Sequence, residues 1–113
     1  MQFLYVKVPV VNRVRDRTRQ LEDKIDDVLK QAGVGAVAGW GDSLGAAMPD
    51  GSRPVAYTRI DVDVSDLASA RALLRQNLAA FGAPDGTEIH YTMDHRRHMD
   101  VYSEPDWLLH QPC

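Results

Sequence analysis

The sequence is poor in cysteine: its 113 residues include a single one, Cys113. One thiol cannot form a disulfide within the chain, and a zinc site needs several converging ligands that a cysteine cluster would supply. Long apolar runs are lacking as well, so we expect no signal peptide, no membrane span and no membrane partner. These absences make a cytoplasmic location the default expectation.

The sequence also lacks an excess of positive charge. Its 13 lysines and arginines stand against 16 aspartates and glutamates, which gives a net charge of −3. This balance argues against a general nucleic-acid binder, which needs a basic surface. The 44% hydrophobic and 26% charged residues are typical of a globular protein. We expect one domain over residues 1–113, with a core at 1–93 and a C-terminal extension at 94–113.

The clearest pattern lies between residues 55 and 91 and predicts a strand, a helix, a tight turn and a second strand. Apolar and polar residues alternate through 59–64, as they do on a half-buried strand. Ser65 and Asp66 supply helix-start chemistry, and Gly82 ends the helix. The turn follows at 84–86, and the last strand continues to residue 93. The predicted buried face of the helix consists of Leu67, Ala70, Leu74, Leu78 and Phe81.

The N-terminal half predicts a strand at residues 3–10, a long helix and a hairpin. Asn12 can cap the helix and Gly33 can end it, about 20 residues later. The hairpin pairs 34–47 with 55–64, and its glycines, Gly39 among them, are typical of a β-bulge. A phosphate-binding loop would require a helix directly after these glycines. The sequence places a turn and another strand there, which disfavours a phosphate site. The predicted apolar stripe of the helix consists of Val14, Thr18, Leu21, Ile25, Val28 and Ala32.

This order of elements predicts an α+β fold of the ferredoxin-like βαββαβ type. We expect a four-stranded antiparallel sheet with both helices on one face. In the extension, the run 103–106 resembles a helix start with Pro105 in the first turn. A short apolar helix there would cover an edge or end of the sheet. The alternative is that Trp107 and Leu108 form a dimer contact.

The sheet face opposite the helices is the first candidate site. If Ile60 and its neighbours pack on the helices, alternation places on the other face Tyr5, Lys7, Arg59, Asp61, Asp63, Glu88 and His90. Asp61 and Asp63 would lie about 7 Å apart along the strand, but two carboxylates alone are no metal site. His90, His95 and His98 lie near the end of the last expected strand, where the adjacent arginines would repel a cation. We therefore expect no metal and no cofactor.

The charges of the long helix suggest that a partner uses them. Arg15 and Arg19 lie in its N-terminal half, where cations oppose the helix dipole, although solvation alone would also account for them. RNA is excluded as a partner because Asp61 and Asp63 stand where phosphates would pass, even though Tyr5 could stack on a base. No serine lies in a nucleophile motif, so no catalytic residue is predicted. The predicted partner-binding residues are Arg15, Arg19, Trp40, Asp42, Arg59, Asp61, Asp63 and His90.

Several runs resemble small stand-alone bacterial proteins of ferredoxin-like type. They are Gly39-Trp40-Gly41 with Leu44-Gly45, Ile60-Asp61-Val62-Asp63, Leu73-Leu74, and Gly82-Ala83-Pro84-Asp85-Gly86-Thr87-Glu88. Some such proteins are immunity proteins, which neutralise a cognate toxin by binding it. The resemblance covers residues 34–91 and implies a fold and a binding role. It implies no individual functional residue.

The sequence therefore predicts a protein-binding module that is not an enzyme, with a toxin-neutralising role as its most concrete form. The expected partner is another protein, with a homodimer as the alternative. A small enzyme that uses His90 with Asp61 or Asp63 is the second class of function. A small-molecule sensor with its ligand near Asn12 or the 39–45 segment is the third.

Overall fold

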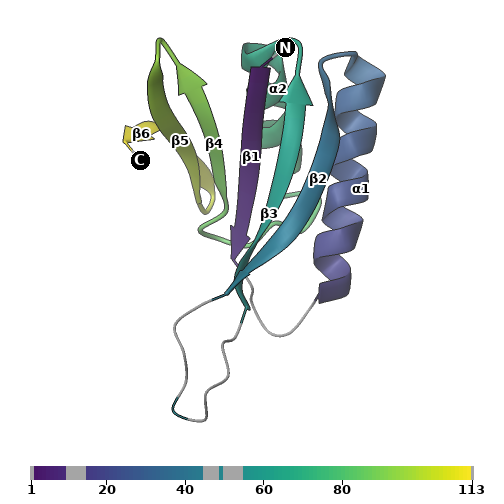
Figure 1. Cartoon of the computed structure of the whole chain (residues 1–113), viewed down its shortest axis with the longest axis vertical. Coiled ribbons are helices and arrows are strands. Elements are labelled where there is room, and N and C mark those ends of the chain that lie inside the picture. The colour runs from purple at the N-terminus through teal and green to yellow at the C-terminus, as the bar shows by residue number, and fades with distance from the viewer. Residues whose placement is uncertain (1, 10–14, 45–48, 50–54, 113) are drawn as a thin grey trace.

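The computed structural model describes residues 2–9, 15–44, 49 and 55–112, without the side chains of 15–19, 42–44 and 55–56. In the described part of the chain, neighbouring strands pair antiparallel and form one sheet in the order β2-β3-β1-β4-β5-β6 (Figure 1). The elements follow one another as β1 (Gln2–Pro9), α1 (Arg15–Ala32), β2 (Gly35–Leu44), β3 (Val55–Val64), α2 (Leu67–Asn77), β4 (Glu88–Met93), β5 (Arg96–Ser103) and β6 (Asp106–Pro112).

The α+β class is confirmed, but the prediction of a four-stranded ferredoxin-like sheet is wrong because the sheet has six strands. The additional strands, β5 and β6, come from the extension in which a short helix was expected. Asp94 and His95 have φ angles of 53° and 63° and form a two-residue turn between β4 and β5. Such turns need positive φ at both central positions, which aspartate and histidine tolerate better than most residues.

The residues that were expected to start a helix instead connect β5 to β6. Ser103 and Asp106 face each other across the turn, and Tyr102 pairs with Trp107. Proline has a φ near −65°, which suits the first turn of a helix and a tight turn equally well. The local signal at Pro105 therefore could not distinguish the two structures.

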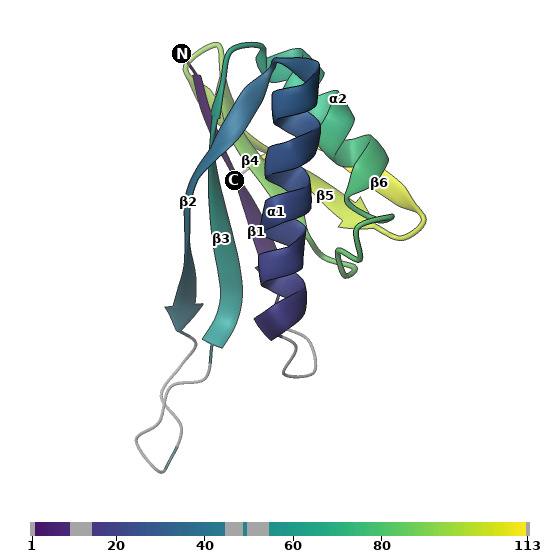
Figure 2. The same cartoon turned by 90° about the vertical axis from the view of Figure 1, so that its right-hand side faces the viewer.

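Both helices pack on the same side of the sheet, and the hydrophobic core lies between these two layers (Figure 2). Leu4, Val6, Ile60, Val62 and Ile89 face this core and are fully buried. The β5–β6 hairpin curves around α2. Among the described residues, no helix is long and apolar enough to cross a membrane.

The buried face of α2 is the one that the sequence predicts. Leu67, Ala70 and Leu74 of α2 are buried, and Leu78 and Phe81, which follow α2, also contribute to the core. The helix ends at Asn77, before the predicted stop at Gly82. The carboxylate of Asp66 accepts the backbone N–H of Ser69 at 3.1 Å, which confirms the predicted start.

The buried stripe of α1 differs from the prediction. Leu21, Ile25 and Leu29 are buried, whereas Val28 is half-buried. The helix therefore packs on the sheet through Leu21, Ile25 and Leu29, which are spaced four residues apart. The register of packing, which the sequence does not contain, selects this row over the neighbouring one. Asn12 and Val14 lie outside the described residues, as does the side chain of Thr18.

Candidate functional site

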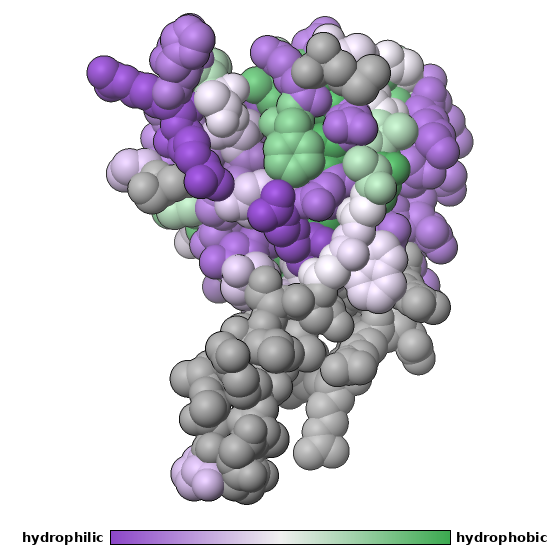
Figure 3. All heavy atoms as spheres, viewed as in Figure 1, coloured by the Kyte–Doolittle hydropathy of each residue, from purple (hydrophilic) through white to green (hydrophobic). Residues whose placement is uncertain are grey.

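The face of the sheet that the helices leave uncovered, called here the open face, carries the charged and aromatic residues expected from alternation. Tyr5 of β1 lies opposite Asp61 on β3 and His90 on β4. One row further along β1, Lys7 lies opposite Arg59 and Glu88. Residues directly opposite each other in antiparallel strands share a face, so these side chains are neighbours. Figure 3 shows this face, where a small hydrophobic area in the middle of the sheet is surrounded by hydrophilic side chains.

A stack of three side chains forms the centre of the open face. The guanidinium carbon of Arg59 lies 4.0 Å from the centre of the Tyr5 ring. The ring of His90 is stacked on Tyr5 at 4.5 Å, with only 7° between the planes. Since β1 lies between β3 and β4, Arg59 and His90 contact opposite faces of the tyrosine ring. Cation–π and stacking contacts of this kind contribute about 0.5–1.5 kcal/mol each.

Charged groups hold this stack in place at its ends. Nε of Arg59 donates to Asp61 Oδ1 at 2.6 Å, and Nε2 of His90 lies 2.7 Å from Glu88 Oε1. Arg97 donates from Nη2 to the Tyr5 hydroxyl at 3.1 Å. The carboxylate of Asp61 is thus engaged by Arg59, and Asp63 is exposed. The surface is pre-organised, because each of these side chains is fixed by its neighbours.

Two further contacts complete the open face. The ammonium of Lys7 lies 4.2 Å from the centre of the Tyr57 ring and 4.0 Å from Glu88 Oε1. Phe3, 6.4 Å from the Tyr5 ring, is 45% exposed. A large aromatic side chain exposed beside an ordered aromatic and guanidinium stack is typical of the centre of a protein interface.

The structure does not bring all predicted binding residues together on this face. Trp40 lies opposite the buried Ile60, and Asp42 lies opposite the buried Thr58, so both positions belong to the helix side of the sheet. The predicted bulge is present between Val37 and Gly39. It precedes both residues, so Trp40 and Asp42 lie at positions on the same face of the sheet. Arg15 and Arg19 belong to α1, but their side chains lie outside the described part of the structure.

The three histidines near β4 do not converge. His90 belongs to the open face, His95 lies in the β4–β5 turn, and His98 lies opposite Tyr91 on the helix side. In the described ranges, no group of three or more histidine, cysteine, aspartate or glutamate residues could hold a metal ion. A shallow groove of about 250 Å³ lies between α1 and the segment that follows α2, lined by Lys24, Asp27, Val28, Gln31 and Phe81.

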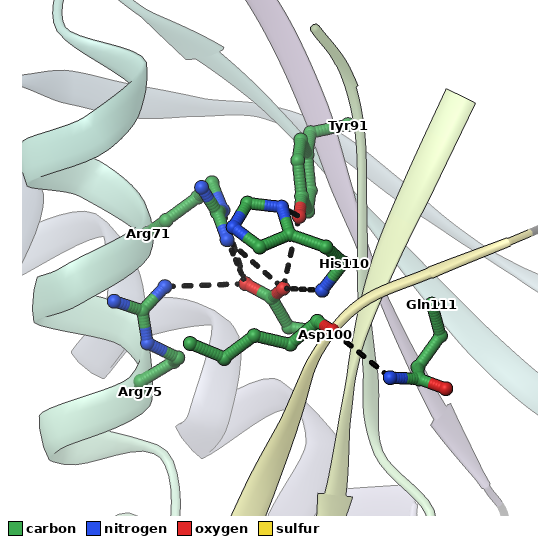
Figure 4. Close-up of polar contacts among 7 residues, drawn as sticks. Arg71, Arg75, Tyr91, Asp100, His110 and Gln111 are labelled. Atoms are coloured by element: carbon green, nitrogen blue, oxygen red, sulfur yellow. Dashed lines mark hydrogen bonds and ion pairs between the residues drawn. The ribbon is translucent and has the colours of Figure 1, made fainter. Parts of the chain in front are cut away.

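A second polar cluster, which the sequence did not reveal, lies around Asp100 on the helix side (Figure 4). Asp100 is fully buried and accepts Nε and Nη2 of Arg71 at 2.8–3.0 Å. Arg75 Nη1 donates to the same carboxylate at 3.2 Å, and so does the backbone N–H of His110 at 3.1 Å. The cluster therefore connects α2, β5 and β6.

Tyr91 extends this cluster to His110. Its hydroxyl donates to Asp100 Oδ1 at 3.0 Å and lies 2.7 Å from Nδ1 of His110. Because the hydroxyl proton goes to Asp100, Nδ1 of His110 must carry a proton and donate to the tyrosine oxygen. Burial, together with the hydrogen bond to Asp100, raises the pKa of Tyr91 to about 12. The phenol thus stays neutral far above neutral pH.

The signal for this cluster was present but ambiguous. Arg71 and Arg75 are four residues apart, next to the apolar stripe of α2, and Asp100 lies between His98 and Tyr102 on β5. No buried side-chain nitrogen or oxygen of the described residues lacks a hydrogen-bond partner. A fully satisfied buried network fixes the arrangement of the elements it joins. We therefore assign the Asp100 cluster a structural role.

Comparisons of the chain with family models, with characterised proteins and with solved structures find no match. The candidate site therefore depends on geometry alone.

Proposed function

We propose that this chain works by binding another protein on its open face. The observation that carries the proposal is the stack of Arg59, Tyr5 and His90 with the exposed Phe3 beside it. Aromatic and arginine side chains contribute most of the binding energy in protein interfaces. Side chains that are already ordered lose little conformational entropy when a partner binds. Both properties favour protein binding.

The same stack argues against nucleic acid as the partner. A base stacks on an aromatic ring only if one face of that ring is available. Arg59 and His90 contact the two faces of Tyr5, and Lys7 lies over the ring of Tyr57. Asp61 and Asp63 add negative charge beside the stack, where a phosphate would be repelled. The toxin-neutralising role that the sequence suggests stays a prediction.

Site-specific photocrosslinking in cells tests the proposal. A photoreactive phenylalanine analogue at Phe3 should crosslink a protein, whereas the same analogue at Gln76, exposed on α2, should not. The protein that crosslinks at Phe3 is then identified and its affinity measured by calorimetry with the purified chain. Arg59→Ala should weaken that binding about tenfold or more, because an arginine in a stacked centre of an interface contributes above 1.4 kcal/mol. Equal crosslinking at Phe3 and Gln76 would contradict the proposal.

A further inference from the structure

The open face consists of rows of side chains that run across the strands. Adjacent strands lie about 4.8 Å apart, so each row spans the sheet from β2 to β5 in four steps. The first row contains, in strand order, Gly41, Arg59, Lys7, Glu88 and Val101. The second row contains Gly39, Asp61, Tyr5, His90 and Met99.

The charges on the two sides of β1 are complementary to each other. A two-fold axis that runs parallel to β1 through Tyr5 would place β3 of one copy over β4 of a second copy. Arg59 would then face Glu88 of the second copy, and Asp61 would face His90 of the second copy. Opposite charges would meet between Arg59 and Glu88, twice in the dimer because the axis repeats every contact, and the imidazole of His90 would lie within reach of the Asp61 carboxylate.

The rows also match in shape. The same axis places β2 over β5 of the second copy, so Gly41 meets Val101 and Gly39 meets Met99. A Cβ atom added at Gly39 or Gly41 would have no neighbour within 4 Å, so open space lies above both glycines. Met99 and Val101 are half-buried apolar side chains that could enter this space. The charge pattern and the glycine space are independent features, and both fit the same axis.

We propose that the occupant of the open face is a second copy of this chain, packed face to face about an axis along β1. The proposal rests on the proposed function, because it names the partner of the same surface. Phe3 and Tyr5 lie on the axis and would be covered by the same residues of the second copy. Lys7 also lies near the axis, but its ammonium is drawn aside to Tyr57 and Glu88, which limits the repulsion between the two lysines.

The size of the surface indicates how strong such a dimer is. Four strand spacings give a width of about 19 Å, and the eight residues of β1 give a length of about 27 Å. Each copy thus offers about 500 Å², and the pair about 1,000 Å², which is at the low end for a specific interface. We expect a weak dimer whose population rises with concentration.

Sedimentation velocity with a pair of charge reversals tests the proposal. The wild-type chain should shift from monomer to dimer as its concentration rises from roughly 1 μM to 1 mM, a range that covers weak affinities. Arg59→Glu alone and Glu88→Arg alone should each stay monomeric, because like charges meet across the axis twice. An equimolar mixture of the two variants should dimerise again, since both contacts are then between opposite charges. Circular dichroism confirms that each variant is folded.

A substitution that fills the open space above Gly39 provides a second test. Gly39→Leu should abolish the dimer without disturbing the monomer, because nothing in the same chain occupies that space. Gln76→Leu adds the same side chain on α2 and should leave dimerisation unchanged. A wild-type chain that stays monomeric at the highest concentration, or a charge-reversed mixture that stays monomeric, would overturn the proposal.

Sedimentation and crosslinking together distinguish the second-copy proposal from the proposed function. If the chain is monomeric but Phe3 crosslinks a different protein, the open face binds that protein and only the second-copy proposal fails. If the chain is monomeric and Phe3 crosslinks nothing beyond the Gln76 control, the proposed function fails as well.

Discussion

Replacing Asp100 with asparagine perturbs the buried cluster with the least change of shape. The substitution removes the negative charge that faces Arg71, whose side chain is 8% exposed. Removing one partner of a buried ion pair costs about 3–5 kcal/mol, because the remaining charge is left uncompensated. Arg75 is 24% exposed and can turn toward water, so most of the loss arises at Arg71. We expect Asp100→Asn to lower the free energy of unfolding by about 4 kcal/mol.

This loss is large for a chain of 113 residues. Small domains are stabilised by about 5–15 kcal/mol, and at about 4 °C per kcal/mol the melting temperature should fall by about 15 °C. Urea denaturation followed by circular dichroism measures the change. The double variant Arg71→Met with Asp100→Leu removes both charges. It should lose less stability than Arg71→Met alone and Asp100→Leu alone added together.

Two results would refute this reasoning. A loss below about 1 kcal/mol for Asp100→Asn would show that Arg71 is not a buried, unpaired charge in the variant. Additive single losses in the double variant would show that the two side chains do not interact.

Three further predictions concern other parts of the fold. The pKa of Tyr91 is raised to about 12 from its usual 10, so the unfolded chain loses the phenol proton at a lower pH than the folded chain does. The free energy of unfolding should therefore fall as pH rises from 10 to 12. This fall should be missing in Tyr91→Phe when unfolding is measured across that range. Asp26 pairs with Lys30 and accepts the Val37 N–H at 2.9 Å, and both contacts lower its pKa, so Asp26 should contribute stability above its usual pKa of 3.8 that is lost as pH falls further; a carboxyl titration by NMR that gives an ordinary pKa would contradict this. Leu29→Ala should cost about 3 kcal/mol and Val28→Ala about 1 kcal/mol, because only Leu29 is fully buried; equal losses in urea denaturation would favour the stripe expected from the sequence.

The two polar clusters have connected roles. The Asp100 cluster joins β5 to α2 and so fixes the position of this strand from the helix side. The other side of β5 presents Arg97, Met99 and Val101 to the open face. A loss of the cluster should therefore disturb the open face as well as the stability of the fold.

The sequence by itself determined the elements whose patterns are local. The alternation in 59–64 sets which residues of β3 are buried, because successive side chains of a strand point to opposite faces. The apolar spacing of α2 and the cap at Asp66 act within a few residues of the chain. These features, together with the charged open face, could be predicted because their causes lie close together in the sequence.

Only the tertiary structure decided the rest. Residues 94–112 carry turn and proline signals that suit a helix or a hairpin, and pairing of β5 with β4 selected the hairpin. Asp100 is as polar as any surface residue in the sequence, but Arg71, 29 residues earlier, makes its burial possible. The face on which Trp40 lies depends on the bulge after Val37 and on the partner strand. In each case the deciding contact joins residues far apart in the chain, and no local pattern contains it.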